Sequence, residues 1–593
     1  MTDPLKPRDL ARLARAAPGK AGDVLGRLPL ERQVDAVLAV PPADRVSVLL
    51  AAPRPMRLVR SIPDGDLYLT IREAGVADAV PLLGLASPAQ LTHLLDLESW
   101  RGDRFDAARA GAWTAVLLEA GESALRRLAR NADDALLALL FHRWARAHAI
   151  ETDDQTPVHG SGETESGDDR GFVSPCGYYR FDPLDTRQAA AVRRLAELLF
   201  LDDPERYFRL LWATVSESEG ELEEDGLRWR ASRLEEHGYP PYDEAMQIYA
   251  PPLATRRAPA PAVVDAGETD AVAPRWGERE VRAGGALARA LEGLTLEEAE
   301  TARRELVATA ARIVVADGLD AGDPASHHAA ARKAAALVQV GIETRVREQG
   351  LPEAEVLRGY PVVELFRHGH ERVAGLARRA RAWFTGGWPQ GREARLEWLE
   401  PPLRARLVGL LADRPVHLDL DGDATASRVR DFETMSEIEE ARAALDVAGA
   451  LGEVFGERLE IDLERVAAAG AALGHPVGFS TLLLTALAWH ATGRGSRVEP
   501  LPPAVVADFL RTVASRRTAA PDAPERALDA WIAELAARSL LDARECAVTR
   551  AFGRGCLERL AAECGSLDPG IPVDGRHVSC LLLEPKEGLR VDG

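Results

Sequence analysis

Lysine is almost absent from this chain of 593 residues: four of its 73 basic residues are lysine, and the others are arginine. Alanine and leucine are abundant at the same time, which is typical of proteins from GC-rich bacterial genomes. We therefore interpret the arginine excess mainly as background composition, and we give a single arginine cluster only modest weight.

Cysteine and long apolar stretches are scarce as well. Five cysteines in 593 residues form no disulfide framework, and their odd number fits a reducing cytosol. The longest apolar stretches, residues 135–141 and 479–489, fall far short of the ~20 residues that a membrane-spanning helix needs. The N-terminal segment lacks the basic and then apolar pattern of a signal peptide. We expect a cytoplasmic protein that does not cross a membrane.

Positive charge is in deficit, since 73 basic residues face 93 acidic ones and the formal net charge is −20. A surface of this sign repels the phosphates of nucleic acids and of anionic membranes, so a nucleic-acid partner is not expected. The hydrophobic fraction of 46% and the charged fraction of 28% are those of a folded globular protein.

Three common nucleotide-binding and catalytic motifs are absent from the sequence. Around Gly19-Lys20 the first glycine and the Ser/Thr of a P-loop are missing. Gly553-Arg-Gly555 continues as Cys-Leu-Glu, unlike a dinucleotide fingerprint, and Gly478-Phe-Ser480 lacks the last glycine of a nucleophile elbow. The sequence predicts no catalytic residue and no cofactor, and it favours a role other than catalysis.

Metal-ligand patterns are equally weak. The acidic run that begins at Asp419 lacks the sixth-position glycine and the twelfth-position glutamate of a calcium loop. Four cysteines and one histidine gather near the C-terminus without a C-x-x-C pair that would clamp a tetrahedral ion: Cys546, Cys556, Cys564, His577 and Cys580. We predict no metal site, with these cysteines as small core residues.

Short helices that start near prolines are predicted for the first 150 residues. Pro29, Pro41 and Pro53 recur every 12 residues, and related positions follow at Pro63 and Pro88. Apolar residues at spacings of three and four follow several of these prolines, which predicts helices of two or three turns. Helices this short need neighbours for stability, so we expect them to stack as an α-solenoid, with an irregular bundle as the alternative.

Long amphipathic helices are predicted further on, with only minor β structure around residues 177–181. The C-terminal candidates are residues 296–316, 326–349, 360–384, 431–456, 480–490, 503–516, 524–539 and 542–564. Asp203-Pro204 predicts the start of another helix, which places Tyr207, Phe208, Leu211 and Trp212 at core spacing. The fold class is all-α.

Five segments follow from these patterns. They are a short-helix domain at 1–150, an acidic insertion at 151–171, a compact unit at 172–250 with minor β structure, a Pro/Ala-rich linker at 251–284, and a helical C-terminal bundle at 285–593.

One segment, residues 227–252, combines arginines and aromatic residues in the way that is usual for interaction hot spots. Its candidate binding residues are Arg228, Trp229, Arg230, Arg233, Tyr239 and Tyr242. Guanidinium–aromatic pairs can also stack on a nucleic-acid base. A structural role is the alternative that we favour for these side chains, because the acidic neighbours would neutralise a phosphate-binding face. In this alternative Trp229 and the tyrosines seal a small core, and the arginines pair with Glu235, Glu236 and Asp243.

Two stretches carry a resemblance to known families. LPLERQVDAVLAVPPADRVSVLLAAP near the N-terminus and RWRASRLEEHGYPPYDEAMQIYAPP further on resemble an uncharacterised bacterial family, a domain of unknown function. The first stretch also resembles, more distantly, the cytosolic helical domain of MgtE magnesium transporters. That resemblance implies a superhelix of short helices and contact with other proteins, and it carries over neither magnesium transport nor a magnesium site.

The leading hypothesis is therefore a cytosolic scaffold or protein-interaction protein with a protein partner. The alternative is an enzyme whose active site lies at the junction of the two halves of the chain, where Arg228, Arg230, Tyr239 and Asp243 are the first residues to consider.

Overall fold

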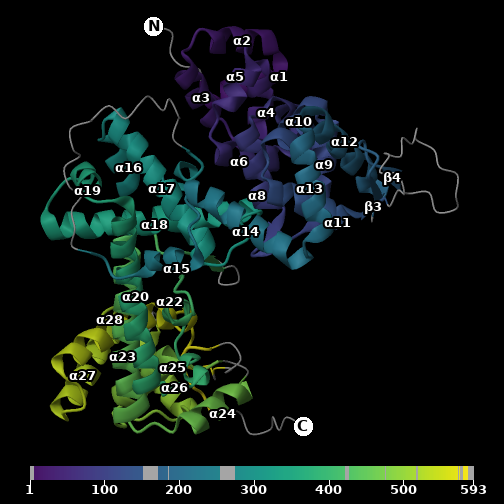
Figure 1. Ribbon diagram of the computed structural model, residues 1–593. Coiled ribbons are helices and arrows are strands. Elements are labelled where there is room, and N and C mark those ends of the chain that lie inside the picture. Colours follow the sequence, from purple (N-terminus) through teal and green to yellow (C-terminus); the bar gives the residue numbers. More distant parts are fainter. Residues whose placement is uncertain are drawn as a thin grey trace. The chain divides into compact units, whose positions relative to one another are not determined.

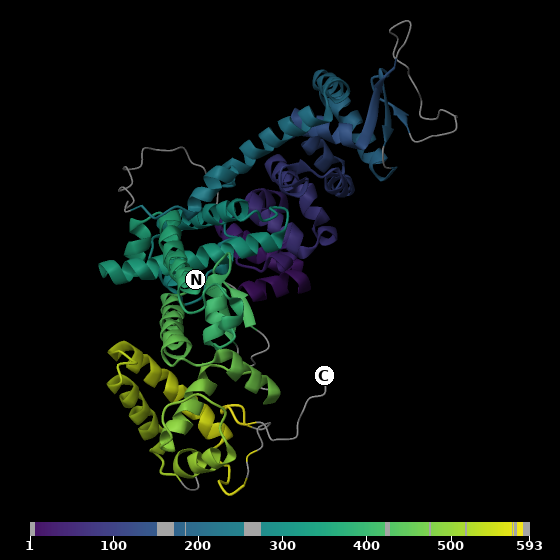
Figure 2. The ribbon, with the colours of Figure 1, turned by 90° about the horizontal axis from the view of Figure 1, so that it is seen from below.

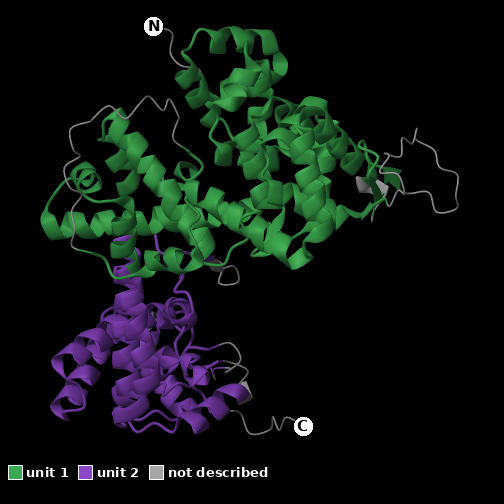
Figure 3. Cartoon of the chain, in the orientation of Figure 1, with its two compact units in different colours: residues 1–370 green, residues 371–593 purple. Residues whose placement is uncertain are grey.

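The computed structural model describes residues 6–150, 171–183, 186–253, 274–420, 427–473, 476–515, 519–571, 573 and 578–584. Contacts divide the chain into two compact units, residues 1–370 and 371–593 (Figure 3). The all-α prediction is confirmed: 28 α-helices lie in the described residues, beside three small antiparallel sheets. Most of the predicted insertion at 151–171 and most of the linker at 251–284 lie outside the described residues.

Helices of two to three turns fill the first hundred residues, as the proline spacing predicts (Figure 1). They are α1 (Pro7–Ala16), α2 (Pro18–Gly26), α3 (Leu30–Leu38), α4 (Pro42–Ala51), α5 (Pro55–Arg60), α6 (Asp64–Ala74), α7 (Val76–Leu85) and α8 (Pro88–Glu98). Pro29, Pro41 and Pro63 occupy the position just before α3, α4 and α6. Each helix packs on near neighbours in the chain, as α4 does on α1, α2 and α6.

A buried arginine ties these short helices together. Arg45 on α4 is 1% exposed, and its guanidinium donates to the carbonyl oxygens of Val40 and Leu38 and to Thr70 Oγ1. Its Nη1 lies 3.8 Å from the buried carboxylate of Asp66 on α6. Since carbonyl groups at helix ends lack intrahelical partners, this one side chain satisfies the end of α3 and joins α4 to α6.

The next part of unit 1 contains longer helices and most of the β structure. The hairpin β1 (Trp100–Arg101) and β2 (Arg104–Phe105) precedes α9 (Ala107–Glu119), α10 (Glu122–Asn131) and α11 (Asp134–Trp144). The three-stranded sheet, with strand order β3-β5-β4, is formed by β3 (Ala145–Ala149), β4 (Phe172–Val173) and β5 (Tyr179–Pro183). Figure 2 shows this sheet beside α12 (Thr186–Asp202), which β5 contacts. The helices α13 (Pro204–Ser216) and α14 (Glu219–Glu236) follow, and Asp203 caps α13 as predicted.

The remaining elements of unit 1 are largely helical. They are α15 (Tyr242–Ala245), the 3₁₀ turns η1 (Met246–Tyr249) and η2 (Glu278–Glu280), α16 (Ala286–Glu292), α17 (Leu296–Ala316), α18 (Pro324–Gln349), α19 (Glu353–Gly359) and the start of α20 (Val362–Gly386). Gly341 on α18 and Gly369 on α20 face each other so closely that a Cβ on either would overlap a carbonyl oxygen of the opposite helix. Residues 274–284, within the range expected to be a linker, are packed here, and Trp276 is buried.

Unit 2 is a helical bundle with one small hairpin. Its further elements are α21 (Glu393–Leu396), α22 (Leu403–Leu411), β6 (His417–Leu420), β7 (Ser427–Arg430), α23 (Met435–Glu453), the π-turn η3 (Val454–Arg458), α24 (Leu463–Leu473), α25 (Phe479–Ala491), α26 (Pro503–Phe509), the π-turn η4 (Leu510–Ala514), α27 (Ala523–Ala537) and α28 (Ala543–Glu563). Its core contains the buried rings of Trp388, Phe455, Phe479 and Trp531. Among all the residues described, no helix combines the length and the apolar character that crossing a membrane requires.

Candidate functional site

The six candidate binding residues of segment 227–252 do not form one site. Four of them lie on α14, and its two sides have different roles. Arg230 and Arg233 are directed toward neighbouring elements of unit 1, whereas Arg228 and Trp229 are exposed. Beyond the helix, Tyr239 is buried and Tyr242 is 58% exposed.

The inward side of α14 is structural. Arg233 donates two hydrogen bonds of 2.7 Å to the carboxylate of Asp96 on α8 and one of 2.6 Å to Asp133, the N-cap of α11. Arg230 donates to the backbone oxygens of Asp96 and Gly102, and its guanidinium lies over the Trp100 ring. Burial lowers the pKa of Arg230 to about 10. A structural role is thus the correct interpretation for these two arginines, but their partners differ from the expected Glu235, Glu236 and Asp243.

The outward side of α14 contributes to an apolar groove. Trp229 is 55% exposed, and Arg228 beside it pairs with Asp225 one turn away, at 2.6 Å. The hollow that Trp229 lines has a volume of about 650 Å³ and is walled by α11, α13 and α14. We call it the aromatic groove and define it by Ala135, Ala138, Phe208, Trp212, Leu222 and Trp229. Of the six candidates, only Trp229 belongs to it.

Two aromatic residues of α13 in this groove were expected in the core. Tyr207 and Leu211 are buried as predicted, but Trp212 is 65% exposed and Phe208 is 39% exposed. At ~100° per residue, Phe208 and Trp212 lie about 100° around the helix from Tyr207 and Leu211, so they form a second apolar stripe beside the core stripe. The apolar face of α13 is wider than packing against one core requires. This width was the signal in the sequence that part of the face would remain exposed.

Carboxylates predominate at the edge of the aromatic groove. Asp134, Glu217 and Asp225 line it together with one arginine, Arg209. Asp134 accepts from Arg206 at 2.6 Å and lies 3.5 Å from Arg209. The edge therefore combines exposed indole rings with three carboxylates, of which Asp134 and Asp225 are paired with arginines.

Tyr239 points into a different hollow of unit 1. Its hydroxyl lies 2.8 Å from Nε2 of the buried His327, and its ring lines a pocket that also contains His93 and His237. The groups proposed for an enzyme, Arg228, Arg230, Tyr239 and Asp243, are thus not gathered at one cavity of this unit.

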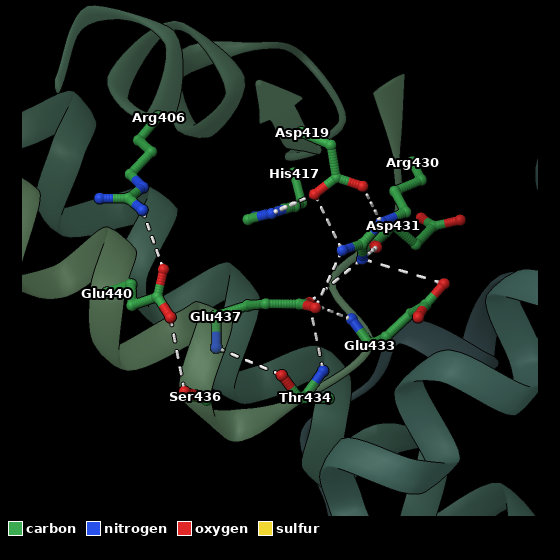
Figure 4. Close-up of polar contacts among 10 residues, drawn as sticks. All are labelled: Arg406, His417, Asp419, Arg430, Asp431, Glu433, Thr434, Ser436, Glu437 and Glu440. Carbon is green, nitrogen blue, oxygen red and sulfur yellow. Dashed lines mark hydrogen bonds and ion pairs between the residues drawn. The ribbon is translucent and has the colours of Figure 1, made fainter. Parts of the chain in front are cut away.

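A dense charge network occurs in unit 2, at the junction of the β6–β7 hairpin and α23 (Figure 4). Arg430 donates two hydrogen bonds to the carboxylate of Asp419, of 2.7 and 3.1 Å, and two to that of Glu437. Glu437 also accepts from the backbone N–H groups of Glu433 and Thr434 at the start of α23. Although burial disfavours its charge, these carboxylates raise the pKa of Arg430. The network fastens the hairpin to the helix, and Asp419 acts here as an arginine partner.

Three of the C-terminal cysteines are core residues as predicted, whereas Cys546 is partly exposed, contrary to the prediction. Cys556, Cys564 and Cys580 are buried free thiols, with the Sγ atoms of the last two 3.7 Å apart. Within the described part of the chain, no three His, Cys, Asp or Glu side chains are grouped so that they could hold a metal ion. His577 lies outside the described residues.

Comparison with known proteins gives one match. The model of a family of unknown function (DUF6178) matches residues 23–584, which is nearly the whole chain. No curated protein and no solved structure matches the chain.

Proposed function

The chain belongs to this family of unknown function (DUF6178), and from that premise we propose that it is a cytosolic interaction protein whose aromatic groove binds a helix of another protein. The observation that carries the proposal is the exposure of Trp212 and Trp229 in one groove of about 650 Å³. Exposed aromatic residues are rare on monomeric surfaces and are enriched at interfaces, where they supply most of the binding energy.

The partner segment that fits is a basic amphipathic helix. Apolar and aromatic side chains line the groove, which is the lining that receives the apolar face of an amphipathic helix. Asp134, Glu217 and Asp225 at the edge would attract lysine or arginine residues that flank the apolar stripe of such a helix.

The cytosolic part of the proposal rests on the five cysteines, all of which are free thiols. Free and buried cysteines are usual in a reducing compartment. The similarity of the first 150 residues to the cytosolic helical domain of MgtE also stays a prediction, supported by short helices that begin at prolines and pack on near neighbours.

The test uses site-specific crosslinking on the full chain, with a photoreactive residue at position 208 in the middle of the groove. Crosslinked proteins from the native host are identified by mass spectrometry, together with the crosslinked peptide. We expect a peptide from another protein with apolar residues at helical spacing and flanking lysine or arginine. Trp212→Ala/Trp229→Ala should abolish the crosslink, whereas Tyr242→Ala, an equally exposed aromatic change outside the groove, should preserve it.

Three outcomes would overturn the proposal. Crosslinks to a second copy of this chain would make the groove a self-association surface. Crosslinks to acidic or extended peptides would exclude the basic helix. Equal crosslinking in the double Trp variant and in wild type would show that the groove does not contribute to binding.

A further inference from the structure

A second hollow of unit 1 is built as a small-molecule site. It has a volume of about 540 Å³, within the range of ligand pockets, and no described residue lines both this pocket and the aromatic groove. Its walls come from distant parts of the chain: the α5–α6 connection, α8, the turn after α14, residues 274–276 and α17. We call it the histidine pocket.

The deepest polar group of the histidine pocket is His93 on α8. Its side chain is 3% exposed, and among the described residues its Nδ1 has no hydrogen-bond partner. Burial, reinforced by the neighbouring His237 and His327, lowers the pKa of His93 well below its ordinary value, so the ring is neutral. A buried polar atom without a partner costs roughly 1–3 kcal/mol, and a bound ligand group would remove that cost.

The other histidine of the pocket is held in place from both sides. The rings of His93 and His237 lie 4.2 Å apart, and His237 Nε2 is 3.6 Å from the carboxylate of Asp64 at the start of α6. Asp64 is therefore already engaged by a side chain of the pocket. Burial raises the pKa of Asp64, and the neighbouring His237 acts in the opposite direction.

Two arginines and two large aromatic rings are among the other residues that line the pocket. The exposed arginines Arg60 on α5 and Arg304 on α17 lie at the mouth. The walls are the buried rings of Trp276 and Tyr239, with Trp276 packed on Gly65. Arg60 also donates to the backbone oxygen of Leu85, which is a neutral partner. The charged residues that line the pocket are thus two arginines and one carboxylate, a local balance that favours anions.

We infer that the histidine pocket binds a small organic anion with a planar ring. The anionic group lies at Arg60 and Arg304, the ring lies against Trp276 and Tyr239, and a polar atom of the ligand bonds to Nδ1 of His93. A carboxylate or a phosphate satisfies the arginines equally, so the shared chemistry is a planar ring that carries an anionic group.

The probes are 2-naphthoate, its neutral amide 2-naphthamide, and phenyl phosphate. Binding to the full chain is followed by titration calorimetry. We expect 2-naphthoate or phenyl phosphate to bind, and 2-naphthamide to bind at least about tenfold more weakly than 2-naphthoate if the carboxylate is recognised. The better of the two anions identifies the anionic group as a carboxylate or a phosphate.

Three variants locate the binding. Arg60→Gln/Arg304→Gln at the exposed mouth should weaken the better anion by about tenfold or more, and His93→Gln should weaken it as well. Arg57→Gln, on the same helix α5 but outside the pocket, is the matched control and should leave binding unchanged. Circular dichroism establishes whether each variant is folded. If His93→Gln does not fold, the binding measured for Arg60→Gln/Arg304→Gln alone tests the inference.

The inference is overturned if neither anion binds at about 10 mM, if the amide and the naphthoate bind equally and phenyl phosphate does not bind, or if the mouth variant binds like wild type. Loss of crosslinking at the aromatic groove would leave these results untouched, so the two proposals fail separately.

Discussion

Arg233 donates two charged hydrogen bonds to the carboxylate of Asp96, from Nε and Nη2, each of 2.7 Å. The two residues are 137 positions apart, and the Asp96 side chain is 2% exposed. Loss of the Arg233 guanidinium would leave the buried carboxylate of Asp96 without its main counter-charge. This destabilises a protein far more than the loss of a surface ion pair. This contact therefore makes α14 part of the core of unit 1.

Arg233→Met is accordingly expected to destabilise unit 1 by about 3 kcal/mol. Hydrogen–deuterium exchange of peptides from α8 and α14 measures the change at the site, and urea unfolding measures it for the chain. Arg228→Met is the matched control on the same helix, since the Arg228–Asp225 pair is exposed and worth less than about 0.5 kcal/mol. Equal protection loss in the two variants would contradict the assignment of Arg233 as the structural arginine.

A protonated histidine predicts how stability depends on pH. His328 at the start of α18 lies 2.9 Å from Glu280 through Nδ1 and 2.9 Å from Glu73 through Nε2. These two carboxylates raise the pKa of His328 to about 9. Between its unfolded value of about 6.5 and 9, the native state binds more protons than the unfolded state, so this contribution to stability is lost as the pH rises.

We expect the free energy of unfolding to fall by about 2 kcal/mol from this group between pH 6.5 and 9.5. The difference between wild type and His328→Gln isolates it, because all other groups titrate in both proteins. The variant should be less stable than wild type at pH 6.5, and the two should converge near pH 9.5. A constant difference across this range would show that His328 is not the titrating group.

Local sequence signals were sufficient for the helices. Prolines and N-cap residues mark helix starts through short-range sterics and hydrogen bonds, so the predicted helix at 296–316 coincides with α17 and that at 326–349 nearly matches α18. Partners across the fold were not predictable in the same way. Arg233 was expected to pair within its own segment, and its actual partners are Asp96 on α8 and Asp133 at the start of α11.

The same distinction applies to the sites. Trp229 was named as a candidate because its arginine and aromatic neighbours are unusual, but the interpretation that we favoured placed it in a small core, and Trp212 was assigned to a core as well. Both rings are exposed, because composition and periodicity reveal apolar residues without saying what covers them. The histidine pocket is harder still to predict. His93, His237 and Trp276 come from three separate segments, each carrying an ordinary residue, and only the folded chain brings them together.

The charge network of unit 2 predicts a local stability effect. Because Arg430 joins Asp419 of β6 to Glu437 of α23, Arg430→Gln should cost about 2 kcal/mol and should increase hydrogen exchange in β7 and in the first turns of α23. Arg406→Gln is the control, since Arg406 forms an ion pair with the half-exposed Glu440 at the protein surface. Unchanged exchange in Arg430→Gln would mean that the hairpin is held by other contacts.

The cysteines predict a pattern of thiol reactivity. Burial raises the pKa of Cys556 to about 12, and the contact with Cys564 together with burial raises the pKa of Cys580. Since the thiolate is the reactive form, native Cys556 should react with iodoacetamide at pH 8 on the order of a thousandfold more slowly than a free cysteine. Cys546 is the partly exposed thiol among the five and should be labelled first.

Timed labelling, digestion and mass spectrometry give the labelling rates of the five cysteines. In urea, where the chain is unfolded, the five rates should become similar. If Cys556 and Cys580 react as fast as Cys546 in the native protein, the packing of α28 against the C-terminal segment is incorrect, because in that arrangement reagent reaches neither sulfur before the helix opens.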